Sequence, residues 1–261
     1  MKALYEAGDT KAREVFKPEI LKRFLSGNIH VIMYLISEGY LKYFEFEEII
    51  WLFKECIEIV GSHYYSALKA QHFWFLRETG NDYFYGENFE KAIKYFKDAL
   101  KICPFNIETL NQLGETHLER GEYELAKTLF EKAIKIPSSD DDILSKIYKR
   151  SAMYNLGISY NKLYLFNKAI TACNKAMDLD WDLVHARDHV NTWDQIAIAY
   201  EGMGDFKRAK AARKIYKKKV NKMKKKFRRM RILSNLSTFF YCFLIFTPLI
   251  FVILSIILLS R

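Results

Sequence analysis

Residues that interrupt helices are scarce in this chain, whose 261 residues include only 11 Gly and 4 Pro. Half of the residues are hydrophobic, which excludes a chain that is disordered throughout. Lys, Glu, Leu, Ile, Tyr and Phe are abundant instead, and this composition favours long helices over many short strands. We therefore predict an all-α protein.

Signals of metal binding, catalysis and secretion are also lacking. The four cysteines have no Cys-x-x-Cys spacing, so we expect them to pack in the interior of a protein from a reducing compartment: Cys56, Cys103, Cys173 and Cys242. His185 and His189 are four residues apart, but Ala186 stands where a metalloprotease helix carries glutamate. No phosphate loop, nucleophile elbow or secretory signal is visible. We predict no enzyme, no cofactor and no metal site.

Acidic residues are missing after Asp205, and one basic segment sets the net charge of +10. The segment from Lys207 to Arg231 contains 15 Lys or Arg in 25 residues. Without that segment and Arg261, the chain has 25 basic and 31 acidic residues, a net charge of −6. A nucleic-acid-binding protein usually spreads basic residues over a whole face, so nucleic acid is not the favoured partner.

The stretch from Leu236 to Leu259 contains 24 residues without a charge. At about 1.5 Å per residue it would reach about 36 Å, enough to cross a hydrocarbon core. We predict a transmembrane anchor within residues 232–259, rather than a buried core helix. Basic residues precede this span, so the rest of the chain is expected to face the cytosol. The arrangement resembles tail-anchored membrane proteins, and the choice of membrane stays open.

The basic residues at 207–231 form a predicted juxtamembrane stem. Near an anionic leaflet each Lys or Arg contributes about 1 kcal/mol of attraction. An RNA or ribosome tether is an alternative, but only Tyr216 and Phe227 supply aromatic rings for base stacking. The candidate lipid-contacting residues are Lys217, Lys218, Lys219, Lys222, Lys224, Lys225, Lys226, Arg228, Arg229 and Arg231.

Residues 80–104 and 114–137 are nearly the same sequence, and Gly80 and Gly114 are 34 residues apart. A period of this length is typical of helix-turn-helix repeats, which bury their apolar faces by stacking. The pattern resembles the tetratricopeptide repeat, whose characteristic positions hold Gly80, Tyr83, Ala92, Phe96, Ala99 and Pro104 in the first copy. We predict four repeats, at 73–106, 107–140, 150–183 and 190–219.

Residues 30–63 carry a weaker trace of the pattern, in which Ile49 replaces a small residue. We interpret this segment as a degenerate or capping repeat, and residues 1–29 as an N-terminal helical segment with a short helix from Pro18. The acidic run Asp140–Asp142 is expected to start a helix rather than to bind calcium. The predicted fold is a tetratricopeptide-like α-solenoid, followed by the stem and one transmembrane helix.

The resemblance implies a scaffold that binds a protein partner in the groove formed by the first helix of each repeat. One subset of the family grips acidic chaperone tails with five polar residues. Arg77 and Asn81 match the first two and Gln112 is an acceptable third, but Ser151 and Asn155 stand where basic residues are needed. Chaperone docking is therefore a minor alternative.

Amide side chains recur at equivalent places in the repeats and suit the backbone of an extended peptide. The candidate groove residues are Arg77, Asn81, Gln112, Asn155 and Gln195. Solvation of these side chains, or bonding within the fold, is the alternative. We predict a membrane-anchored scaffold or adaptor on the cytosolic side whose groove takes an extended, basic segment. A self-associating protein that organises the membrane is a second possibility.

Overall fold

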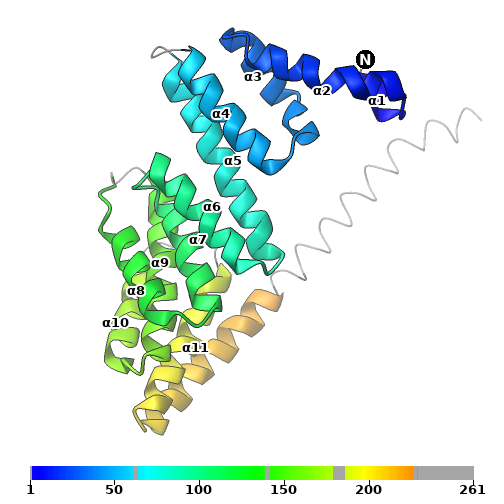
Figure 1. The fold of residues 1–261 in the computed structure, drawn as a ribbon. Coiled ribbons are helices and arrows are strands. Elements are labelled where there is room, and N and C mark those ends of the chain that lie inside the picture. Colours follow the sequence, from blue (N-terminus) through cyan, green and yellow to red (C-terminus); the bar gives the residue numbers. More distant parts are fainter. Residues whose placement is uncertain (1, 61–63, 139–141, 179–185, 226–227, 229–261) are drawn as a thin grey trace, which may run out of the picture. The chain divides into compact units, whose positions relative to one another are not determined.

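A computed structural model describes residues 2–60, 64–138, 142–178, 186–225 and 228 (Figure 1). The chain divides into two compact units, Met1–Lys149 and Arg150–Arg261, and each is described separately below. The described residues form helices and no β-strand. The all-α prediction is confirmed.

The first unit begins with four α-helices and one 3-10 helix. They are α1 (Lys2–Glu6), α2 (Thr10–Phe24), α3 (Ile29–Ser37), η1 (Tyr40–Tyr43) and α4 (Phe46–Val60). Their buried side chains share one core, to which α2 contributes Phe16, Ile20 and Phe24. Apolar residues four positions apart on α2 thus define the face that packs inward.

The predicted helix start at Pro18 is wrong, because α2 already begins at Thr10. The carboxylate of Asp9 accepts a hydrogen bond from the backbone nitrogen of Ala12 at 2.8 Å, which caps the helix at its N-terminus. Pro18 lies inside the helix and removes one backbone donor. Burial of the apolar stripe on both sides of Pro18 offsets that loss.

Two helical pairs with the same internal packing complete most of the first unit. They are α5 (Tyr65–Tyr85) with α6 (Phe89–Ile102), and α7 (Ile107–Glu119) with α8 (Tyr123–Lys135). A Cβ atom placed on Gly80 would lie 2.7 Å from the Phe96 ring, and one on Gly114 would lie 2.6 Å from the Phe130 ring. Only glycine allows this approach, so these residues set the distance between paired helices.

The positions predicted to be small or aromatic on the second helix of each pair, α6 and α8, are fully buried. Ala92, Phe96, Ala99, Ala126, Phe130 and Ala133 have no exposed surface. The helices begin at polar caps: Asn88 accepts from the Lys91 nitrogen at 3.2 Å, and Asn106 accepts from the Thr109 nitrogen at 2.8 Å. Sequence spacing alone therefore located the core of these two pairs.

The helix α9 (Ile143–Lys162) starts in the first unit and continues into the second. Asp142 accepts from the backbone nitrogen of Ser145 at 3.0 Å, which confirms its predicted role at a helix start. Asp140 and Asp141, the other two residues of that run, lie outside the described residues.

The second unit continues with α10 (Phe166–Asp178), α11 (Ala186–Gly202) and a further helix over residues 206–225. A Cβ atom on Gly157 would lie 2.6 Å from the Cys173 sulfur, which repeats the close approach seen at Gly80 and Gly114. Arg213 occupies the place of the aromatic residue in the last predicted repeat. Its guanidinium bonds both carboxylate oxygens of Glu201, at 2.7 and 2.9 Å, and Asp194 at 2.7 Å.

The predicted membrane span, residues 232–259, lies outside the residues that the structure describes. Among the helices that are described, none combines the length and the apolar character needed to cross a bilayer.

Candidate protein-binding surface

A cluster of charged and aromatic side chains lies on the first helices of the two pairs in the first unit. Arg77 on α5 is 7% exposed, and its guanidinium binds Glu78 at 2.6 Å and also Glu108 on α7. The same guanidinium stacks over the Trp74 ring, with its carbon 4.1 Å from the ring centroid. Arg77 is therefore engaged within the fold and is not a free cation for an acidic ligand.

Tyr148, near the start of α9, adds a phenol to this cluster. Burial and a hydrogen bond to Glu108 raise the pKa of Tyr148 to about 12. Two carboxylates face one guanidinium, so the cluster has an excess of negative charge. Trp74 keeps 47% of its surface exposed and the Glu78 side chain keeps 58%. We name Trp74, Arg77, Glu78, Glu108 and Tyr148 the Trp74 cluster.

The predicted groove amides in the first unit bind each other. The Gln112 amide nitrogen on α7 donates to the Asn81 side-chain oxygen on α5 at 2.7 Å. The other end of that amide, the Gln112 oxygen, is buried without a hydrogen-bond partner in the described part of the chain. The Asn81–Gln112 bond thus ties together the first helices of adjacent pairs, beside the Trp74 cluster.

A similar bond occurs in the second unit. The side-chain nitrogen of Asn161 on α9 donates to the backbone oxygen of Gln195 at 2.9 Å and to its side-chain oxygen at 3.1 Å. Asn155, one of the predicted groove residues, is buried. In each unit, then, predicted groove amides connect or line the first helices of helical pairs.

The sequence did not predict some of the residues that contact the groove candidates. Trp74 follows the first residue of a predicted repeat, but neither Trp74 nor Asn161 has a distinctive spacing in the sequence. Glu108 is not among the predicted groove residues. Its pairing with Arg77, 31 residues away, depends on how α5 and α7 pack. No local pattern could reveal that pairing.

The basic stem begins on the helix over residues 206–225. Its described candidate residues are Lys217, Lys218, Lys219, Lys222, Lys224, Lys225 and Arg228. Partial burial and the neighbouring charge of Lys222 lower the pKa of Lys219. Lys226, Arg229 and Arg231 lie outside the described residues.

These observations define a protein of stacked helical pairs whose first helices carry polar and aromatic side chains. Residues 80–139 match the family described as tetratricopeptide repeat. The crystal structure of MamA resembles this chain with a TM-score of 0.50 and 23% identity, over 69% of this chain and 95% of that one. BtubC from P. vanneervenii gives a TM-score of 0.52 and 14% identity, over 78% and 92%.

A curated relative extends the sequence comparison. The general transcriptional corepressor trfA of Dictyostelium discoideum is 26% identical over 136 residues, which are 52% of this chain and 9% of that protein. This chain therefore spans less than a tenth of that relative's length. Together the matches support tetratricopeptide repeats over residues 80–139 and a tetratricopeptide-like helical fold.

Proposed function

We propose that this protein is a membrane-anchored tetratricopeptide scaffold that binds an extended, basic segment of a protein partner on the cytosolic side. The observation that carries the proposal is the Trp74 cluster, where an exposed indole and an excess of carboxylate lie on the first helices of adjacent pairs. An indole ring and carboxylates attract a Lys or Arg side chain.

The charge of this cluster favours a basic segment over an acidic tail. A single guanidinium, that of Arg77, already serves two carboxylates, those of Glu78 and Glu108. A third carboxylate from a ligand would meet repulsion and would have to displace one of them. The Asn81 and Gln112 amides, which lie one turn further along α5 and α7, are proposed to contact the backbone of the bound segment.

The proposed anchor rests on the sequence. The uncharged stretch from Leu236 to Leu259 has the length of a membrane span, and it directly follows the basic stem. The stem is proposed to lie against anionic headgroups. This arrangement would hold the repeats close to a membrane surface, where they could recruit or retain a partner.

Two extended peptides that differ only in charge test the groove. We would measure fluorescence anisotropy of a labelled Lys/Arg-containing peptide, and of a matched Asp/Glu-containing peptide, with the full chain. The basic peptide is expected to bind the wild type. Its affinity should be about tenfold or more lower for the double variant Trp74→Ala with Glu78→Gln. Trp51→Ala is the matched control, because Trp51 on α4 is 44% exposed and lies outside the cluster. Tighter binding of the acidic peptide would reverse the proposed specificity.

The amides require a separate test. Gln112→Ala combined with Asn81→Ala should weaken binding of the basic peptide if these side chains contact its backbone. Unchanged affinity, with helicity retained in circular dichroism, would assign both amides to holding the fold together.

Flotation with vesicles tests the anchor and the stem. The full chain should float with vesicles and resist alkaline extraction, whereas a chain that ends at residue 231 should float only with phosphatidylserine-containing vesicles and release in salt. If the full chain is extracted at alkaline pH, the proposed transmembrane anchor is wrong. Salt-sensitive binding of the shortened chain to RNA, but not to anionic vesicles, would favour the tether alternative.

A further inference from the structure

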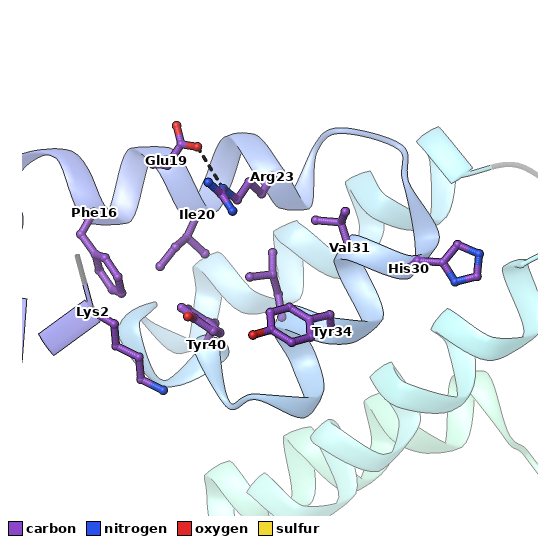
Figure 2. A pocket seen from close by; sticks show the side chains of 10 residues that line it. Lys2, Phe16, Glu19, Ile20, Arg23, His30, Val31, Tyr34 and Tyr40 are labelled. Atoms are coloured by element: carbon purple, nitrogen blue, oxygen red, sulfur yellow. Dashed lines mark hydrogen bonds and ion pairs between the residues drawn. The ribbon is translucent and has the colours of Figure 1, made fainter.

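A hollow in the first unit lies between α2 and α3, well separated in sequence from the Trp74 cluster. It has a volume of about 620 Å³, and its apolar lining includes Leu35. Figure 2 shows three further apolar lining residues, Phe16 and Ile20 of α2 and Val31 of α3. Tyr34, which is 58% exposed, and Tyr40 stand along one wall. We name this hollow the α2–α3 groove.

The spacing of its lining residues matches the length of a short helix. Phe16 and Ile20, and likewise Val31 and Leu35, are four residues apart, so each helix offers one apolar stripe to the groove. From Phe16 to Arg23 the lining of α2 extends over about two helical turns, or about 10 Å. A partner helix with apolar residues at i, i+4 and i+7 presents an apolar face of the same length.

The charges that line the groove favour a partner helix with acidic residues at its ends. Lys2 and Arg23 are the basic residues of the lining and Glu19 is its acidic residue, so the lining has a net positive charge with His30 neutral. In Figure 2, Lys2 and His30 lie at opposite ends of the groove. Glu19, the acidic residue of the lining, binds Arg23 at 2.9 Å. An acidic side chain at one end of a bound helix would therefore meet the Lys2 ammonium, and one at the other end would accept a hydrogen bond from the His30 ring.

We propose that the α2–α3 groove docks a short amphipathic helix of a partner protein, with apolar residues on one face and acidic residues at both ends. The apolar side chains of that helix would cover the apolar lining and contact the Tyr34 ring, and its flanking carboxylates would face Lys2 and His30. This binding mode differs from the extended segment proposed for the Trp74 cluster, so one scaffold would hold two kinds of partner segment.

A designed peptide serves as the probe. We would use a helical peptide of about 16 residues, long enough to be partly helical alone, with leucine at i, i+4 and i+7 and glutamate at both ends. A second peptide keeps the leucines and carries lysine at both ends. Anisotropy with the full chain should show binding of the glutamate peptide at least about tenfold tighter than the lysine peptide, with the difference reduced by salt.

Substitutions at exposed positions locate the binding site without disturbing the core. Tyr34→Glu places a negative charge on the wall of the groove and should weaken binding of the glutamate peptide about tenfold or more. Tyr85→Glu is the matched control, because Tyr85 is 82% exposed on α5, outside the groove. Arg23→Gln, which leaves Glu19 without its partner, should weaken binding more than Lys22→Gln on the same helix, outside the lining.

Three results would overturn the proposal: no binding of the glutamate peptide, equal binding of the lysine peptide, or equal effects of Tyr34→Glu and Tyr85→Glu. Binding of the extended basic peptide to the same variants separates the two sites. Tyr34→Glu should leave that affinity unchanged, and Trp74→Ala should leave the helical peptide unaffected. The failure of one proposal is thus distinguishable from the failure of the other.

Discussion

The helical pairs α5–α6 and α7–α8 and the N-terminal helices α2–α4 bury their apolar faces in different ways. In the pairs, one glycine faces one aromatic ring, as Gly80 faces Phe96 and Gly114 faces Phe130. In the N-terminal helices large side chains fill the space, and Phe16 has its ring centroid 4.6 Å from that of Tyr5 and 4.9 Å from that of Tyr43. The first arrangement sets a fixed helix separation, whereas the second fills whatever separation exists.

Two equivalent positions determine how closely the paired helices pack. At the position of Gly80 the weak repeat has Ser37, and at the position of Ala92 it has Ile49. The helix α4 packs more extensively against α5 than against α3. A β-branched isoleucine at the position of a small residue holds two helices apart, so aromatic rings are needed to fill the remaining space.

The largest expected effect comes from removing the ring in a glycine-paired contact. Phe130→Ala should lower the free energy of unfolding by about 4 kcal/mol, because Phe130 is fully buried against the backbone at Gly114 and the helices cannot collapse into the cavity. Hydrogen exchange of the α7 and α8 amides in the full chain measures the loss locally.

Phe16→Ala is the counterpart in the N-terminal helices. The neighbouring Tyr5 and Tyr43 are only partly buried and can move into the space, so the expected loss is about 3 kcal/mol. A larger loss at Phe16 than at Phe130 would contradict the proposed contrast between rigid and adaptable packing.

The next effect comes from the titration of His72, a buried histidine where the two kinds of packing meet. His72 of α5 stacks on Phe53 of α4 with ring centroids 5.0 Å apart. Burial, assisted by the charge of Lys54, lowers the pKa of His72 from 6.5 to about 4. Between these two pH values the unfolded chain therefore binds a proton more readily than the folded chain. The contribution of the neutral His72 ring to the free energy of unfolding is fully present above about pH 6.5 and is lost as the pH falls to about 4.

The variant His72→Phe keeps a ring on Phe53 and cannot titrate. Between pH 7 and pH 4 the wild type should lose up to about 3 kcal/mol more stability than this variant, as measured by urea unfolding at each pH. His30→Phe, at an exposed position, is the control and should titrate like the wild type. Equal pH dependence of all three proteins would show that the ring of His72 is accessible to solvent.

Sequence reasoning predicted the parts of this fold that depend on local spacing. The 34-residue period located Gly80, Phe96, Gly114 and Phe130, because one small residue and one ring must recur wherever two helices pack closely. It failed at α2, where a single cap at Asp9 decided the helix start. The apolar stripe of α2 indicated a continuous helix more strongly than Pro18 indicated a helix start.

The candidate site was less predictable because its contacts join distant residues. The sequence identified Arg77 as a groove residue but not Glu108 as its partner, and that pairing changes Arg77 from a ligand-binding cation to a neutralised one. The Asn81–Gln112 hydrogen bond is a similar case. Side-chain partners on different helices depend on the crossing of α5 and α7, which composition and period do not specify.

The smallest effect tests the glycine rule itself. Gly114→Ala gains helix propensity of about 1 kcal/mol but places a Cβ atom 2.6 Å from the Phe130 ring, so a net loss of about 1–2 kcal/mol is expected. The equivalent change in the N-terminal helices, Ser37→Ala, affects an exposed residue and should stay within about 0.5 kcal/mol of the wild type.

A double variant decides whether the ring causes the loss. If the clash is with Phe130, Gly114→Ala should cost less when Phe130 is already leucine, and hydrogen exchange of α7 and α8 should show a coupling of about 1 kcal/mol. Additive effects would mean that the helices move apart at no cost. Gly114 would then have no role in setting the helix separation, and the contrast between the repeat pairs and α2–α4 would lose its physical basis.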